Sequence, residues 1–436
     1  MYVKCLKMQN FRGISDLTLD FESNQPTVFI GINGVGKSSI LDCLAILFSR
    51  LLARIQHEPL ANKSVIARLR KQKDLANGKH FNDRDLKNNS QSSYNKIEIL
   101  LSDSQSLTWS LEISREGRDL IRKFDTAQLN EYADRVREQY HKKLKENIPL
   151  TVYYSIHRYV LKVDLEFQEG TISRQIDAYE NSLTKNNVNF ASFFQWFRLI
   201  EDLENEERRD DIEYRDRKLE AVRKAIYSML GEQQFSKLRV RRSPLRMTIE
   251  KQGQELSVNQ LSDGEKGLLA MVGDLARRLA IANPGLDEPL QGSAVVLIDE
   301  IEQHLHPAWQ RRVIPNLTKT FPNCQFIVTT HSPQVISQVQ PESIYILQNV
   351  DDNIIAKRPE SSFGRDSNRI LEDLMGVAER PQEIKDRLLE LFRVIDAGDI
   401  EQAKTIRREL ARDIGEDEPE FVRADILMRR REILNR

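Results

Sequence analysis

Cysteine is scarce in this chain of 436 residues, which contains only three. Cys5, Cys43 and Cys324 are odd in number and far apart in the sequence. They therefore predict neither a disulfide framework nor a zinc site. Free thiols of this kind suit a reducing compartment, so we expect the chain to be cytoplasmic.

Long apolar runs are also missing. The first residues, MYVKCLKMQNFRG, lack the apolar core of a secretory signal, and no run approaches the roughly 18 apolar residues of a membrane span. The sequence therefore predicts no membrane association. Hydrophobic residues nevertheless make up 40% of the chain, which is too many for a wholly disordered protein. The length favours two domains, or one large domain with insertions.

An excess of charge of either sign is lacking as well. The chain carries 65 Lys and Arg against 66 Asp and Glu, which gives a formal net charge of −1. This balance excludes a general attraction to nucleic acid or anionic lipid, so binding to DNA or RNA would need a local patch. The candidate contacts lie in a predicted basic strand at 239–249 and are Arg239, Arg241, Arg242 and Arg246.

The hydrophobic pattern that is present predicts an α/β fold. Alternation indicates strands within 1–30 and a hairpin at 96–115. Short apolar runs typical of buried strands occupy 27–30, 150–154, 294–298 and 325–330. Helices are predicted at 37–54, 119–147, 189–232 and 268–282, and along the charged tail at 366–436. A polar stretch at 57–95, rich in Lys, Asn and Ser, is expected to be a mobile insertion.

Residues 31–38 read GINGVGKS and fit the pattern G-x-x-x-x-G-K-[ST]. Glycines let the backbone wrap around phosphates, so that amide N–H groups form an anion nest at the start of a helix. Lys37 would reach the β- and γ-phosphates of ATP, and the Ser38 hydroxyl would ligate Mg²⁺. A chance glycine-rich turn is the alternative, but a strand precedes this loop and an amphipathic helix follows it. The predicted nucleotide-binding residues are Asn33, Gly34, Val35, Gly36, Lys37, Ser38 and Ser39.

The apolar strand at 294–298 ends in two carboxylates, Asp299 and Glu300. A strand buried on both faces delivers the side chains at its carboxyl end to the sheet edge where ligands bind. Asp299 is therefore a candidate for the Mg²⁺ shell, and Glu300 is a candidate to orient or deprotonate the attacking water. The alternative is an acidic pair at a helix N-terminus, where carboxylates are also favoured.

Residues 261–267 read LSDGEKG and precede a predicted helix. Ser262 and Glu265 have the spacing of a capping box, and a capped helix N-terminus can also bind phosphate. The segment resembles the signature motif of ABC-type ATPases in the SMC, RecF and OLD-like group, with Asp263 in place of the commoner glycine. In that family the signature of one subunit closes on ATP held by the other. The resemblance implies a head-to-tail dimer, or a higher oligomer, with ATP against Ser262, Asp263, Gly264 and Glu265.

Further segments resemble motifs of the same family in the family's order. Arg12, in the segment NFR, would lie near the phosphates; the alternative is an ordinary arginine at a strand end. His331, in TTHSP, resembles the switch histidine that touches the γ-phosphate. Residues 302–307, EQHLHP, resemble a D-loop at the dimer interface, although His-x-His could also suggest a metal site. The weakest match is the Q-loop, placed at 153–158, because it contains no glutamine.

Together these motifs imply an ABC-type P-loop ATPase head with a mixed β-sheet core, a helical insertion and a helical C-terminal tail. The expected parts are an N-terminal lobe at 1–56, an insertion with a hairpin, the Q-loop region and a helical arm at 57–238, a C-terminal lobe at 239–365 and a tail at 366–436. The charged helices of the insertion are either a solvated cover over the core or an arm that binds a partner.

The tail decides which function the resemblance implies. It looks like the C-terminal region of the PtuA-type ATPases of Septu anti-phage systems, whose partner is a separate HNH nuclease. OLD-like nucleases carry a Toprim domain with a glutamate and an Asp-x-Asp cluster, and this chain offers only Asp351-Asp352. We therefore expect an ATPase that is not itself a nuclease. The alternatives are a RecF-like repair ATPase that clamps DNA and, less compatible with Asp263, a transporter motor.

Overall fold

In the computed structural model the chain forms two units. The first unit comprises residues Met1–Arg365 and is organised around a six-stranded sheet. Its strands, in spatial order, are β14 (Asn353–Lys357), β13 (Ile344–Val350), β3 (Thr27–Ile30), β12 (Cys324–Thr329), β11 (Ala294–Ile298) and β7 (Leu150–Tyr154). All run parallel except β14, which pairs antiparallel with β13. Since parallel strands end at the same edge, the segments that follow β3, β7, β11 and β12 lie side by side there.

The structure describes residues 1–434 except 23–24, 57–78, 80, 102–103, 118, 143–145, 157, 159–172 and 185–189. Most of the insertion predicted at 57–95 therefore lies outside the described residues, as does His157 in the predicted Q-loop region. The described part of the insertion contains a short 3-10 helix at Asp83–Asp85 and the start of a strand at Ser92.

A second sheet, of five antiparallel strands, contains the predicted hairpin. Its order is β2 (Ile14–Asp20), β1 (Tyr2–Phe11), β4 (Ser92–Leu100), β5 (Ser106–Glu116) and β6 (Asp119–Asp125). The helix predicted at 119–147 is wrong at its start, because β6 pairs with β5 and the helix α3 covers only Ala127–His141. The strand β6 lies at the sheet edge with mostly exposed side chains, so backbone pairing rather than apolar alternation defines it.

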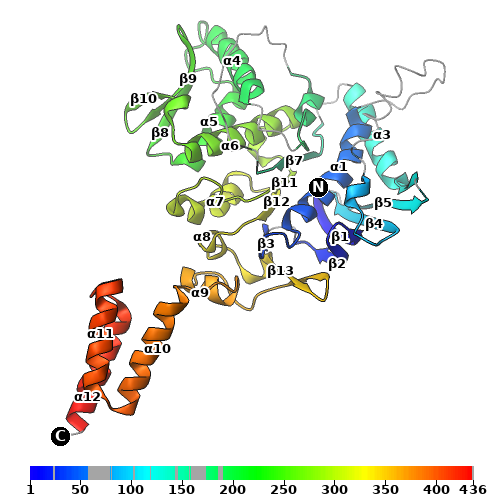
Figure 1. Cartoon of the computed structure of the whole chain (residues 1–436). Coiled ribbons are helices and arrows are strands. Elements are labelled where there is room, and N and C mark those ends of the chain that lie inside the picture. The colour runs from blue at the N-terminus through cyan, green and yellow to red at the C-terminus, as the bar shows by residue number, and fades with distance from the viewer. Residues whose placement is uncertain are drawn as a thin grey trace. The chain divides into compact units, whose positions relative to one another are not determined.

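The helix α1 (Lys37–Gln56) lies between these two sheets (Figure 1). It packs on β4 and α3 on one side and on β7, β11 and β12 on the other. Trp109 of β5 anchors it, since the indole Nε1 donates to the Leu47 carbonyl at 3.1 Å and the ring contacts Phe48 edge-on. This position explains why the helix is buried on nearly all of its faces, although the sequence pattern predicted a single apolar face.

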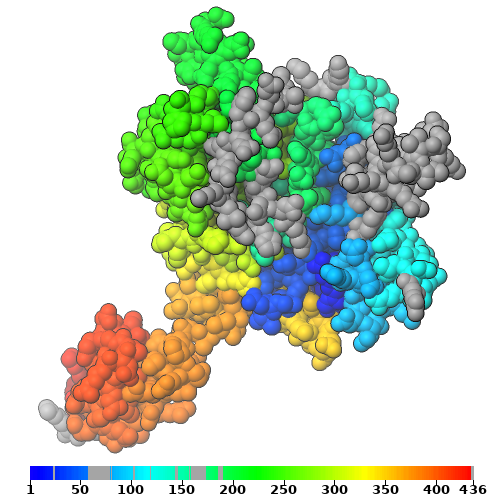
Figure 2. Space-filling model, turned by 45° about the horizontal axis from the view of Figure 1, so that its top comes forward, coloured from blue at the N-terminus to red at the C-terminus, as the bar shows by residue number. Residues whose placement is uncertain are grey.

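The charged helical region predicted at 189–232 consists of two helices, α4 (Phe190–Glu207) and α5 (Arg217–Leu230). Both pack on the long helix α6 (Asp263–Ala282) and on β8 (Phe235–Arg242), which forms a three-stranded sheet with β9 (Leu245–Lys251) and β10 (Gln254–Ser257). The turn between the two helices protrudes at the top of the space-filling view (Figure 2).

Part of this charged stretch is buried rather than solvated. Glu204 is only 2% exposed and accepts hydrogen bonds from Arg223 Nη1 at 2.9 Å and from the Asp216 backbone at 3.0 Å. Glu201 is also buried and binds Arg223 and the backbone N–H of Val240. These carboxylates attach α4 to α5 and β8, so they serve the packing of this unit.

Two of the parallel strands of the central sheet are followed by helices. The helix α7 (Pro307–Thr320) comes after β11 and is capped by His306, and the helix α8 (Pro333–Ile336) comes after β12 and is capped by Ser332. None of the helices in the described part of the chain combines the length and apolarity needed to cross a bilayer.

The tail forms a second unit, Asp366–Arg436, with its own core. Its helices are α9 (Ser367–Asp373), α10 (Gln382–Ala397), α11 (Ile400–Ile414) and α12 (Pro419–Leu434). Apolar faces of the last three pack together through residues that include Leu391, Leu410, Phe421 and Met428. The helical tail and the mixed central sheet confirm the predicted α/β class with a helical C-terminal part.

A buried ion-pair cluster fixes α6 against the central sheet and gives a first prediction. Asp274 accepts hydrogen bonds from Arg278 at 2.7 Å, Arg277 at 2.9 Å and the Tyr154 hydroxyl at 3.0 Å. Its replacement by alanine leaves two buried arginines without their carboxylate, so we expect a loss of about 3–5 kcal/mol in the free energy of unfolding. Denaturant titration at pH 7 measures this loss, and the exposed Asp210→Ala is the matched control.

The same cluster predicts how stability depends on acid. Burial opposes ionisation of Asp274, but Arg278 and Arg277 outweigh it and lower the pKa of Asp274 to about 2 from an ordinary value of 3.8. The unfolded chain therefore binds this proton more readily than the folded chain. The stabilisation should be complete above about pH 4 and disappear as the pH falls toward 2. An Asp274→Ala variant with the same acid sensitivity as the parent chain would contradict this assignment.

Candidate nucleotide-binding site

Four predicted motifs meet at one edge of the central sheet. The glycine loop follows β3, Asp299 follows β11, and His331 lies just beyond the end of β12. The predicted Q-loop region follows β7 at the same edge. The sheet topology thus gathers residues that are separated by up to 300 positions in the sequence.

The glycine loop requires its first glycine. Gly31 has a φ of 145°, and a Cβ atom there would lie 2.6 Å from the backbone oxygen of Leu347 on β13. The loop then leads directly into the N-terminus of α1. Its backbone N–H groups and the positive end of this helix favour an anion.

Lys37 is buried at this helix start, and its Nζ donates to the backbone oxygens of Gly31 and Ile32, both at 2.9 Å. Burial lowers the pKa of Lys37, while the charges of Asp299 and Glu300 oppose that shift. The side chain therefore lies within electrostatic reach of the acidic strand end. Its ammonium group has a third N–H with which to meet a phosphate.

Asp299 connects the loop to two strands. The Ser38 hydroxyl donates to Asp299 Oδ1 at 3.1 Å, and the Thr329 hydroxyl donates to the same oxygen at 2.6 Å. Asp299 is only 4% exposed. A hydroxyl and a carboxylate side by side are hard oxygen donors, and Mg²⁺ typically takes one or two such protein ligands together with phosphate oxygens. The residues present therefore fit this ion.

Glu300 has an unusual backbone conformation. Its φ is 48°, in the left-handed region that residues other than glycine rarely adopt. Its N–H donates to Thr329 Oγ1 at 2.7 Å. Among the described residues no hydrogen bond or ion pair holds its carboxylate, which leaves this group available for a ligand or water.

Glu302 has a different task from Glu300. Its carboxylate accepts the Thr330 hydroxyl at 2.7 Å and the His331 backbone N–H at 2.5 Å. It thereby attaches the segment after β11 to the segment after β12. The contact fixes the backbone of His331 to Glu302.

Arg158 is a functional candidate that we did not predict individually. It lies in the expected Q-loop region, is 7% exposed, and donates from Nη1 and Nη2 to the backbone oxygens of Asp299 and Glu300. The Q-loop motif of the family normally contains a glutamine, and no local sequence pattern distinguishes Arg158 from its neighbours. Only the pairing of β7 with β11 brings it to the acidic strand end.

Arg12 forms ion pairs within the chain. Its guanidinium binds Asp42 on α1 at 2.5 Å and Asp85 at 2.9 Å, and Asp42 also accepts the Tyr153 hydroxyl at 3.1 Å. These contacts link β1, α1 and β7. Proximity of Arg12 to the phosphates stays a prediction.

The signature segment begins α6 as expected. Ser262 Oγ accepts from the Glu265 N–H at 3.4 Å, and Glu265 Oε2 accepts from the Ser262 N–H at 2.9 Å, which confirms the capping box. Lys251 of β9 also binds Glu265, at 2.6 Å. Asp263 is paired with Lys266 on the surface, at 2.8 Å.

The predicted D-loop packs against the signature. A Cβ atom on Gly264 would lie 2.6 Å from the backbone oxygen of His304, so only glycine permits this approach. His306 accepts the Ala308 N–H through Nδ1 at 3.2 Å and thereby caps α7. No cluster of three or more metal-binding side chains occurs in the described part of the chain, so the two histidines form no such cluster there.

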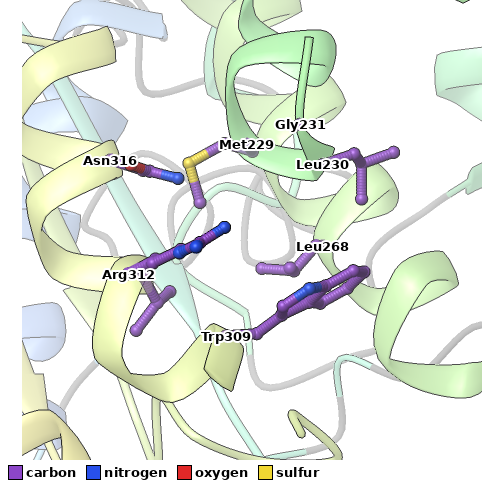
Figure 3. A pocket seen from close by; sticks show the side chains of 8 residues that line it. Met229, Leu230, Gly231, Leu268, Trp309, Arg312 and Asn316 are labelled. Carbon is purple, nitrogen blue, oxygen red and sulfur yellow. The ribbon is translucent and has the colours of Figure 1, made fainter. Parts of the chain in front are cut away.

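A separate hollow lies between α5, α6 and α7 (Figure 3). In the close-up, Trp309 and Arg312 of α7 face Leu230 and Leu268 across it. None of the side chains that line this hollow is a carboxylate, so it offers no Mg²⁺ ligand of that kind. It is distinct from the edge of the central sheet that carries Lys37.

The candidate nucleic-acid contacts on β8 and β9 are mostly neutralised within the chain. Arg239 and Arg241 both bind Glu255, at 2.7 and 2.6 Å, and Arg242 binds Glu201 at 3.1 Å. Phosphate contacts would have to compete with these carboxylates. The geometry therefore gives the alternative of a DNA clamp no specific support.

Residues 27–337 match the family model described as "AAA domain, putative AbiEii toxin, Type IV TA system". This span contains the motifs from the glycine loop to His331. The match thus covers the candidate residues that follow β3, β7, β11 and β12, whereas Arg12 lies outside it.

Two curated relatives are similar over most of their length. The chain is 29% identical to the "Retron Ec83 probable ATPase" of Escherichia coli, over 98% of this chain and 86% of that protein. It is 30% identical to the "Retron Vc95 probable ATPase" of Vibrio cholerae, over 89% of this chain and 81% of that protein.

Similarity to the "Septu protein PtuA" of Bacillus mycoides is more partial. The identity is 26% over 76% of this chain, and the chain spans 38% of that protein. The predicted relationship to PtuA is confirmed, and the retron proteins match more of the chain. Among solved structures, the SMC head domain from Thermotoga maritima is 16% identical and covers 83% of this chain and 100% of its own, with a TM-score of 0.44.

Proposed function

Because the chain belongs to this AAA-domain family, we propose that it is an ATP-binding and ATP-hydrolysing subunit of a bacterial anti-phage defence complex. One observation carries the proposal: Ser38, at the end of the glycine loop, lies 3.1 Å from Asp299, at the end of β11. The retron and Septu relatives support the defence setting, and the word ATPase in the retron names supports the chemistry.

Residues of the glycine loop bind the phosphates in this proposal. The backbone N–H groups of residues 33–39 and the N-terminus of α1 meet the negative charge. Lys37 turns its third N–H toward the β- and γ-phosphate oxygens. Ser38 and Asp299 hold Mg²⁺, which neutralises phosphate charge when bound.

Glu300 and His331 act on the reacting group. The carboxylate of Glu300 orients the attacking water and accepts its proton. The His331 imidazole approaches the γ-phosphate, with its backbone held by Glu302. Thr329 fixes Asp299 and the backbone of Glu300, since its hydroxyl accepts from the Glu300 N–H and donates to Asp299.

A second copy of the chain completes the site. The signature residues 262–265 begin α6, and no described contact joins them to the glycine loop of the same chain. A head-to-tail dimer would place the signature of one copy on ATP held by the other, as the family resemblance implies. Formation of the closed dimer would then depend on bound ATP.

The direct test measures ATP binding by calorimetry and phosphate release by the purified chain, with and without Mg²⁺. We expect saturable binding and Mg²⁺-dependent release. Absence of ATP binding at millimolar nucleotide would remove the proposed activity.

The helical tail is the proposed contact to a partner nuclease of the HNH type. Deletion of residues 366–436 should abolish co-purification of this partner from the native host, because it removes the proposed contact. The tail can be removed as a whole, since it is a separate unit with its own core. The truncated chain should still bind ATP and keep a cooperative melting transition. If the partner remains bound to the truncated chain, the tail is not the contact.

A further inference from the structure

Arg158 places a buried positive charge directly behind the acidic end of β11. Its guanidinium donates to the backbone oxygens of Asp299 and Glu300, and Nη1 also reaches Ser155 O at 3.3 Å. A buried cation is costly unless hydrogen bonds compensate for the lost water. All three of these acceptors are backbone oxygens, so the guanidinium fixes main chain.

The main chain that Arg158 fixes is strained. Glu300 adopts a φ of 48°, which the surrounding contacts must hold against its own preference. Thr329 holds the N–H side of this residue, at 2.7 Å, and Arg158 holds its carbonyl side. Rotation of the Glu300 backbone would break both contacts.

The direction of the Glu300 side chain follows from this backbone. Among the described residues no partner fixes its carboxylate, so the Cα–Cβ direction is set by the two backbone contacts. Arg158 also borders a small hollow together with Asp263, Gly264 and His304. It therefore lies between the acidic strand end and the signature segment.

We propose that Arg158 is a positioning residue that holds Glu300 in the strained backbone conformation from which its carboxylate reaches the attacking water. The inference rests on the proposed ATPase function. It assigns Arg158 no contact with ATP, because its donors are directed to backbone oxygens.

The first experiment compares Arg158→Ala with a matched control. We expect the kcat for ATP hydrolysis to fall about 10-fold or more, whereas calorimetric ATP affinity stays within about 3-fold, since the glycine loop is untouched. Arg50→Ala is the control, because Arg50 is also buried and burial lowers the pKa of both arginines to about 10. That control should keep the parent kcat.

The second experiment is a double-mutant cycle. If Arg158 acts through Glu300, Arg158→Ala should lower the single-turnover rate in the parent chain but change it less than about 2-fold in a Glu300→Gln background. Arg158→Lys should retain part of the rate, because an ammonium group keeps the charge but lacks the planar fork.

The outcomes separate the two proposals. An equal loss in both backgrounds, or a loss matched by Arg50→Ala, would show that Arg158 serves general stability and would overturn the inference. Parent-like hydrolysis by Arg158→Ala would overturn it as well. Failure of the ATPase proposal looks different, because the parent chain itself would then neither bind nor hydrolyse ATP.

Discussion

Replacement of Glu300 by glutamine is expected to slow ATP hydrolysis by about 100-fold or more, which is the usual contribution of a general base. Glutamine has nearly the same shape but cannot accept a proton from water. The backbone contacts to Thr329 and Arg158 involve main-chain atoms of residue 300 and should survive the change. Binding of ATP should therefore persist while turnover is lost.

The Glu300→Gln variant should also differ from the parent chain in its assembly. With ATP bound but not hydrolysed, the head-to-tail dimer should accumulate. Size-exclusion chromatography should therefore show a larger species with ATP than without it. Glu360→Gln, an exposed carboxylate of the same unit, is the control and should behave like the parent chain. If Glu300→Gln bound ATP without any change in assembly, the proposed dimer would be wrong.

Replacement of Lys37 by alanine should weaken ATP binding by about 100-fold. The side chain is buried at the start of α1, and hydrogen bonds from a charged donor contribute about 1.5–3 kcal/mol each. Loss of the phosphate contact made by the third N–H of Lys37 would place the affinity beyond ordinary calorimetric titration. Unlike Glu300→Gln, this variant should fail both to bind and to assemble.

Two measurements make the Lys37 result specific. Lys319→Ala removes an exposed lysine of α7 and should leave ATP affinity unchanged. A melting curve shows whether Lys37→Ala still folds after losing its bonds to Gly31 O and Ile32 O. A folded Lys37→Ala protein with parent-like affinity would exclude the glycine loop as the ATP site.

The sequence predicts those parts of the site that depend on neighbours in the chain. The glycine loop lies between a strand and a helix, and the apolar run at 294–298 ends in Asp299 and Glu300. Each signal is contained in fewer than ten residues. Parallel pairing then brings the separate signals to one edge, which is a general property of such sheets.

Other features depend on residues that are distant in the sequence. Arg158 has its acceptors 141 and 142 positions away, and nothing near it indicates them. Glu204 looks like part of a solvated charged face until Arg223 of the next helix is seen to bind it. The sequence pattern does not predict the edge strand β6, because its pairing partner, rather than its own side chains, defines it.

The position of α1 between two sheets has a consequence for hydrogen exchange. Amides exchange with solvent when structure opens, and segments covered on all sides open at free energies close to that of global unfolding. The amides of α1 should therefore be among the last to take up deuterium, even without nucleotide. Added ATP should slow exchange mainly at residues 33–39, whose N–H groups meet the phosphates in the proposal, and should change the rest of α1 little.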